Sequence, residues 1–190
     1  MAGRIDPVPK SGKLTYEDYV TLPDDGRRYE ILDGELAVSP SPTSVHQLVS
    51  HNLEFALSSW VRAQQLGRIW HAPLDLILEP TVVAQPDIFF ISNERSSIVT
   101  KRDVEGAPDL VVEILSESTA ARDRGVKMHI YARHGVARYW IVDVDRRTLE
   151  VHALRDNAYE QIGTYSGNEV ARFDVPDGFT LALAEIWPED

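Results

Sequence analysis

Apolar residues recur at helical spacing in one long segment of the chain. From residue 45 onward they return every three or four positions, and this continues almost to Gly67. The positions are Val45, Leu48, Val49, Leu53, Leu57, Trp60 and Val61. A Ser-Pro-rich stretch, 39–44, precedes them and offers a Ser or Thr as the helix cap. The pattern therefore predicts a long amphipathic helix that ends before Gly67.

Two short apolar runs before this helix predict a β-hairpin. Residues 28–32 and 35–39 flank Asp33-Gly34, a dipeptide typical of a two-residue hairpin turn. Upstream of the hairpin, residues 14–23 predict a short helix that stops before Pro23. Residues 1–13 are expected to form a flexible N-terminal arm.

Four further runs predict the strands of a central sheet. Residues 67–80, 81–92, 107–116 and 136–145 are each predicted to form one strand. Pro86 predicts a bulge or an edge position within the second run, because proline lacks the amide hydrogen that a strand ladder needs. The third run is nearly all apolar, which is typical of a strand that is buried on both faces.

The order of these elements predicts the fold class. A helix is predicted over 118–135, with Gly135 as its stop, and the tail over 148–187 alternates short strands and turns. The core order is then helix, three strands, helix, strand. This order favours an α/β (α+β) fold, in which a mixed sheet is flanked by helices, with an N-terminal β-hairpin and a β-rich C-terminal tail. We expect residues 14–190 to form a single domain.

Composition excludes several classes of protein. The chain is 43% hydrophobic and 26% charged, as in an ordinary globular protein. It has no cysteine, which excludes disulfides and thiolate metal sites and fits a reducing cytoplasm. No apolar stretch is long enough for a transmembrane helix, and the first residues lack the apolar core of a secretory signal. We therefore expect a cytoplasmic protein with no membrane partner.

The charge is strongly negative but unevenly distributed. The formal net charge of −11 argues against broad, non-specific attraction to nucleic acid. Between residues 119 and 139, however, there are five bases and a single acid, Asp123. A local basic face therefore remains possible on an acidic protein.

One acid stands where apolar neighbours favour burial. Glu113 lies within the apolar run 107–116, and a buried carboxylate is costly unless a proton, a cation or a metal compensates its charge. Asp87 occupies the preceding strand, 26 positions earlier. Carboxylates on adjacent strands can bind one hard divalent cation such as Mg²⁺ or Mn²⁺, which polarises a phosphoryl oxygen and activates water. Lys127 follows on the next helix and could orient that water or stabilise developing charge.

Three further residues are candidates to complete such a site. Glu30 and Glu35 lie on the hairpin, and Glu30 stands between apolar neighbours, which favours it. His46 lies near the first turn of the long helix. Plainer interpretations stay open, because Asp87 could be a turn acid, Glu113 could pair with a core arginine, and Lys127 could be a solvated helix lysine.

Several segments together resemble a known family. "YEILDGELAVSPSPTSVHQ", "QPDIFFIS", "PDLVVEILSESTAARDRGVKMHIYARHGVARYWIVD" and "GFTLALAEIW" are similar to the bacterial Uma-two family, within the PD-(D/E)XK restriction-endonuclease-like superfamily. The resemblance implies that Asp87 and Glu113 are metal ligands. The superfamily lysine belongs two positions after the acid, where this chain has Leu115, so the resemblance points to Lys127 as its replacement.

The resemblance also implies a function and partners. It suggests a Mg²⁺- or Mn²⁺-dependent endonuclease that acts on nucleic acid, with DNA favoured over RNA, and a symmetric homodimer in contact through the hairpin or the tail. In this hypothesis Asp87, Glu113, Lys127 and Glu30 are catalytic, and Asp87, Glu113, Glu30 and His46 bind the metal. The alternatives are a non-catalytic binding module of the same fold and a hydrolase of small phosphorylated molecules, which an acidic protein would also suit.

Overall fold

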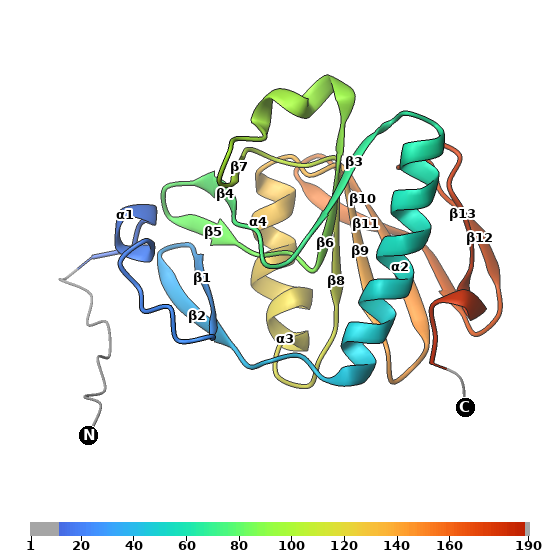
Figure 1. The fold of residues 1–190 in the computed structure, drawn as a ribbon, viewed down its shortest axis with the longest axis horizontal. Helices are drawn as coiled ribbons and strands as arrows, with labels where there is room; N and C mark the ends of the chain where they lie inside the picture. Colours follow the sequence, from blue (N-terminus) through green and yellow to red (C-terminus); the bar gives the residue numbers. More distant parts are fainter. Residues whose placement is uncertain (1–11, 189–190) are drawn as a thin grey trace.

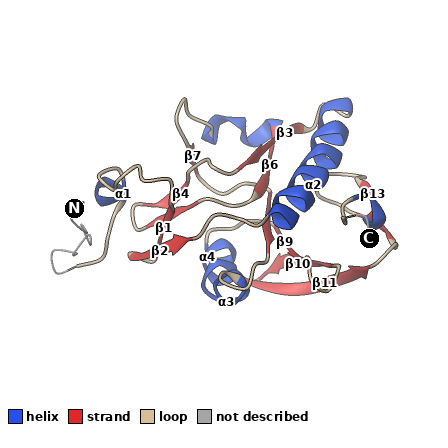
Figure 2. Cartoon of the chain, turned by 60° about the horizontal axis from the view of Figure 1, so that its bottom comes forward, coloured by secondary structure: helices blue, strands red, loops and turns tan. Residues whose placement is uncertain are grey.

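The computed structural model, which describes residues 12–188, contains two main β-sheets with helices around them (Figures 1 and 2). The larger sheet has six strands in the order β11-β10-β9-β8-β6-β3. They are β3 (Gly67–His71), β6 (Ile88–Ser92), β8 (Leu110–Ile114), β9 (Arg138–Asp143), β10 (Thr148–Arg155) and β11 (Ala158–Ser166). Only β8 and β9 are parallel neighbours, so this sheet is mixed, as the sequence predicts.

The second sheet contains the N-terminal hairpin. Its five strands follow the order β2-β1-β5-β4-β7. They are β1 (Arg28–Leu32), β2 (Glu35–Ser39), β4 (Leu76–Glu79), β5 (Val82–Ala84) and β7 (Val104–Glu105). A small third sheet pairs β12 (Val170–Arg172) with β13 (Thr180–Ala182), within the predicted β-rich tail.

The helices lie on opposite faces of the larger sheet. Near the N-terminus is α1 (Tyr16–Tyr19), and the long helix is α2 (Ser44–Ala63). A second helical segment comprises α3 (Ala120–Arg122), the π-helical turn η2 (Asp123–Lys127) and α4 (Met128–Arg133). There are also two 3-10 turns, η1 (Asn93–Ile98) and η3 (Leu183–Glu185). Within residues 12–188, no helix has both the length and the apolar composition to span a bilayer.

Alternation along the central strands divides the buried residues into two cores. Val112 of β8 packs with Leu53 and Leu57 of α2 in one core. Val111, the neighbouring residue, points to the other face and packs with Ile130 and residues of the second sheet. Glu113 shares this second face because side chains two positions apart in a strand point the same way. The helix η2–α4 and the hairpin therefore approach the face that carries Glu113.

The hairpin and the long helix form as predicted. Asp33 and Gly34 both have positive φ angles, of 56° and 84°, as a two-residue turn of this kind requires. The long helix starts at Ser44 after a Thr43 cap that accepts a hydrogen bond from a backbone amide of the first turn. Of the predicted N-terminal arm, residues 1–11 lie outside the described part of the chain.

Two of the predicted strands are wrong in extent. The run 67–80 divides into β3 and β4, and the run 81–92 divides into β5 and β6. In each case the two halves belong to different sheets. Pro73 and Pro86 stand in the breaks, and because proline cannot donate to the ladder, a strand readily ends there. The chain thus passes twice between the sheets, which brings Asp87 to the start of β6.

Candidate active site

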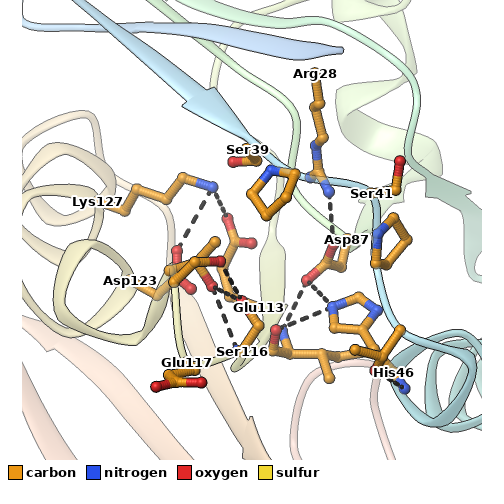
Figure 3. Close-up of a pocket in the computed structure, with 16 residues that line it drawn as sticks. Arg28, Ser39, Ser41, His46, Asp87, Glu113, Ser116, Glu117, Asp123 and Lys127 are labelled. Carbon is orange, nitrogen blue, oxygen red and sulfur yellow. Dashed lines mark hydrogen bonds and ion pairs between the residues drawn. The ribbon is translucent and has the colours of Figure 1, made fainter. Parts of the chain in front are cut away.

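Asp87 and Glu113 face each other across two neighbouring strands. In the antiparallel pair β6–β8, Ile88 lies opposite Val112, so the next position outward places Asp87 opposite Glu113. Directly opposed side chains have Cβ atoms about 4.5–5.5 Å apart and share one face of the sheet. The exposed fractions are only 7% for Asp87 and 2% for Glu113. Both residues line one open pocket of about 530 Å³ (Figure 3).

Lys127 extends from the helical segment into the same pocket. Its Nζ lies 2.9 Å from Glu113 Oε1, 2.9 Å from Glu30 Oε1 and 3.7 Å from Asp123 Oδ1. Burial would lower the pKa of this amine, but the charges of Glu113 and Glu30 raise it well above its ordinary range. Lys127 is therefore a permanent cation, enclosed by three buried carboxylates.

The π-helical turn η2 explains how two charged residues of one helix reach the pocket. Asp123 and Lys127 stand at its ends, and both are buried. A π turn is wider than an α turn and is frequent at functional sites, because it changes the direction of side chains without ending the helix. Gly125, at the middle of the turn, has open space where a side chain would stand. The segment 118–135 is thus helical as predicted, with a local widening that aims Lys127 at Glu113.

One lysine cannot neutralise every acid around it. Burial would raise the pKa of Glu30, but the charges of Lys127 and Arg28 lower it below its ordinary value. The pKa of Glu113, by contrast, is raised. Burial raises the pKa of Glu113 to about 8, and repulsion from Asp123 and Asp87 adds to this, against the attraction of Lys127. Without a further cation, Glu113 is therefore largely protonated near pH 7, with Lys127 and the Tyr131 hydroxyl donating to its Oε1 at 2.9 and 2.8 Å.

Asp87 has partners that keep it ionised. Its Oδ2 accepts a hydrogen bond from the Ile114 amide at 2.8 Å, and its Oδ1 accepts one from Arg28 Nη1 at 3.0 Å. His46 Nε2 lies 3.4 Å from Oδ2. Burial would raise the pKa of Asp87, but His46 and Arg28 hold it well below its usual range.

Comparison with known proteins assigns the family. A family model described as "Putative restriction endonuclease" matches residues 16–184. The chain belongs to the Uma2 family. No curated protein matches it. A solved structure from Anabaena variabilis ATCC 29413, described as "a putative nuclease belonging to DUF820", has the same fold, with a TM-score of 0.75. It is 20% identical, and the match covers 92% of this chain and 97% of that one.

His46 of this Uma2 protein supports Asp87 from the start of α2. Its Nε2 lies 3.0 Å from the Ile114 carbonyl oxygen as well as near Asp87, while its Nδ1 is buried and has no hydrogen bond. Burial would lower the pKa of His46, but the hydrogen bond and the charge of Asp87 raise it above its ordinary value. His46 therefore lines the pocket itself, with its Nε2 directed at Asp87.

The two hairpin acids have different surroundings. Glu30 is only 1% exposed. Its Oε1, which contacts Lys127, also accepts a hydrogen bond from the Gln85 backbone amide at 2.9 Å. Its Oε2 lies 3.7 Å from Arg122 Nη1. It reaches the pocket through Lys127 and is not among the residues that line it. Glu35 is exposed at the start of β2, and nothing places it near the pocket.

The sequence prediction missed several pocket residues, among them Arg28 and Asp123. Arg28 shares a face of β1 with Glu30, because the two are two positions apart, and this alternation could have revealed it. Asp123 precedes Lys127 by one helical turn, and that spacing was the available signal. Its Oδ1 is buried without a hydrogen bond, and burial raises its pKa above its ordinary value.

The donor set of this Uma2 pocket suits a hard divalent cation. Within residues 12–188, no three His, Cys, Asp or Glu side chains form a ready-made ion site. Mg²⁺, however, usually keeps several waters and takes only one or two carboxylates, together with substrate phosphates. Asp87 and Glu113 supply two carboxylates from opposed strands. Lys127, 2.9 Å from Glu113, does not fully offset the burial of this acid, whose pKa stays raised, so a bound cation would add compensating charge.

Proposed function

We propose that this Uma2 protein is a metal-dependent endonuclease that hydrolyses phosphodiester bonds of DNA. One observation carries the proposal: two buried carboxylates, Asp87 and Glu113, face each other in an open pocket beside a buried, permanently charged lysine. A structural ion pair would need neither the second acid nor the pocket. Family membership supports the same class of reaction.

In this proposal Asp87 and Glu113 hold Mg²⁺ or Mn²⁺. The cation, when bound, would polarise the phosphoryl oxygen and make water a better nucleophile. Lys127 cannot serve as a base, because its raised pKa keeps it protonated. It would instead stabilise the negative charge that develops on the phosphate. Glu30 would hold the lysine in position, and His46 would hold Asp87 in position.

The direct test is cleavage of plasmid and oligonucleotide DNA with magnesium or manganese. We expect cleavage that a chelator abolishes, and we expect Asp87→Asn to lose it while the protein stays folded. The net charge of −11 favours the alternative, a non-catalytic module of the same fold. That alternative would be established if the folded wild-type protein cut neither DNA nor RNA and its melting temperature did not change when divalent cations were added.

Metal binding should release a proton. Since the pKa of Glu113 is about 8, a cation that requires the ionised carboxylate must displace a proton near pH 7. We expect close to one proton released per Mn²⁺ at pH 7 and almost none at pH 9.5. Calorimetric titration in buffers of different ionisation enthalpy measures this number. An equal number at both pH values would remove Glu113 from the ligand set.

A symmetric homodimer would allow two sites to act on a duplex. The hairpin and the tail expose apolar side chains, with Val38 at 42% and Val170 at 66%. We expect light scattering to give twice the mass of the chain, and Val170→Asp to shift the protein toward the monomer. A wild-type monomer across a wide concentration range would contradict this part of the proposal.

A further inference from the structure

A second pocket adjoins the candidate active site. It has a volume of about 740 Å³ and lies between the hairpin, α1 and the segment before β4. Arg28 and residues 40–42 line both pockets, so the two pockets adjoin at these residues, and together they are called the groove below. Figure 3 shows Arg28 reaching from β1 toward Asp87 at this junction.

The chemistry of the second pocket suits a phosphate chain. Three arginines line it, namely Arg27, Arg28 and Arg102. The Arg102 guanidinium is exposed and makes no hydrogen bond or ion pair with residues 12–188. The side chain of Arg27 is 65% exposed, and its only ion pair with residues 12–188 is to Asp25, at 3.1 Å. Guanidinium groups bind phosphate oxygens in pairs through their planar donors.

Arg28 still has donor capacity at the junction. Its Nη1 is used by Asp87, and 23% of its side chain is exposed. A guanidinium carries five N–H donors, so one ion pair leaves several of them available. Arg28 can therefore contact a phosphate that lies between the two pockets.

The acids of the second pocket only partly offset these charges. Asp24 and Asp75 also line it. Asp75 Oδ1 already accepts hydrogen bonds from the Tyr19 hydroxyl at 2.7 Å and from Gln85 Nε2 at 2.8 Å. The Tyr19 ring, held by this bond and stacked with the Tyr16 ring, is half-buried and lines the pocket.

From these observations we propose that the second pocket binds the nucleotide next to the scissile phosphate, on the same strand. This inference rests on the proposed function, since it takes the scissile phosphate to lie at Asp87 and Glu113. Arg28 contacts the strand at the junction, and Arg27 and Arg102 bind the flanking phosphates. The groove thus selects a polynucleotide strand over a small phosphodiester.

The test uses Arg27→Gln/Arg102→Gln, which leaves the candidate catalytic residues intact. The matched control is Arg62→Gln/Arg68→Gln, because these exposed arginines line a different pocket beside β3. Each variant is compared with the wild type in three measurements. They are the affinity for a fluorescent single-stranded oligonucleotide in EDTA, the KM and kcat for its cleavage, and the hydrolysis of bis(p-nitrophenyl) phosphate.

We expect the groove variant to bind the oligonucleotide about tenfold more weakly and to raise its KM to the same degree. The slope of log affinity against log salt should become shallower by roughly 0.7 for each phosphate that the variant no longer binds. The kcat and the hydrolysis of the small phosphodiester should not change, and the control should match the wild type.

Other outcomes separate this inference from the proposed function. If the groove variant cleaved DNA as well as the wild type, or lost as much activity on the small phosphodiester as on the oligonucleotide, the groove would be wrong. The proposed nuclease activity would stand in either case. Binding that depends on these arginines without any cleavage would support the groove and remove the nuclease. A wild type that binds no oligonucleotide would overturn the groove outright.

Discussion

Lys127→Met is expected to lower the free energy of unfolding by about 3–5 kcal/mol and to abolish cleavage. The change removes the cation that contacts Glu30 and Glu113, and it leaves Glu30, which is ionised in the wild type, buried without this partner. Methionine fills similar space, so a change in packing contributes little. Urea unfolding followed by fluorescence measures the destabilisation. The destabilisation should shrink as the pH falls toward 5, because the buried Glu30 then takes up a proton.

Two controls isolate the charge effect. Lys101→Met removes an exposed lysine and should change stability by no more than about 0.5 kcal/mol. In the double variant Lys127→Met/Glu30→Gln, the acid that is ionised in the wild type is made neutral, so part of the stability should return. If Lys127→Met were as stable as the wild type at pH 8, the amine would not be the counter-ion that these distances indicate.

Glu113→Gln is expected to separate stability from activity. In the folded protein the pKa of Glu113 is about 8, above its ordinary value of 4.5, so the folded state holds more protons than the unfolded state between these values. Stability contributed by this group is therefore complete below about pH 4.5 and falls as the pH rises to about 8. Glutamine keeps an oxygen for Lys127 and Tyr131 and removes this dependence. We expect the variant to equal the wild type at pH 5 and to exceed it by several kcal/mol at pH 9.

The same variant should be inactive. Removal of one ligand and its charge should lower the cleavage rate by at least about 10²-fold, the scale seen when one electrostatic interaction is deleted from an active site. The metal-dependent rise in melting temperature should also disappear. Urea unfolding at the two pH values and cleavage assays on one preparation give both results. A variant that is less stable than the wild type at pH 9 yet still cuts DNA would show that Glu113 is a structural acid.

Local sequence signals predict only part of this fold. The hairpin follows from Asp33-Gly34, and α2 follows from its helical periodicity, because each depends on neighbours in the chain. The transfer of strands between sheets at Pro73 and Pro86 does not follow from periodicity, since each half keeps an apolar pattern. Proline marks a break but does not show which partner the next strand will choose.

The candidate site, too, follows only in part from local sequence signals. The opposition of Asp87 and Glu113 could be expected once two adjacent strands were predicted, because each residue stood near a strand end. Lys127 was a candidate from its place on the helix after the Glu113 strand, and the family resemblance favoured it over a solvated lysine. The π turn that directs it has no signature in spacing. The role of Glu30 beside Lys127 depends on a contact between the hairpin and the helical segment η2, and sequence alone does not place these two elements relative to each other.

Anomalous diffraction from crystals grown with Mn²⁺ tests the proposed metal site most directly. We expect a manganese peak between the Asp87 and Glu113 carboxylates, on the side that faces the pocket, with water in the remaining positions. The same measurement on Glu113→Gln crystals should show no peak. Well-ordered wild-type crystals in which this position holds no manganese, while Arg28 alone neutralises Asp87, would contradict a metal-dependent mechanism at these two acids.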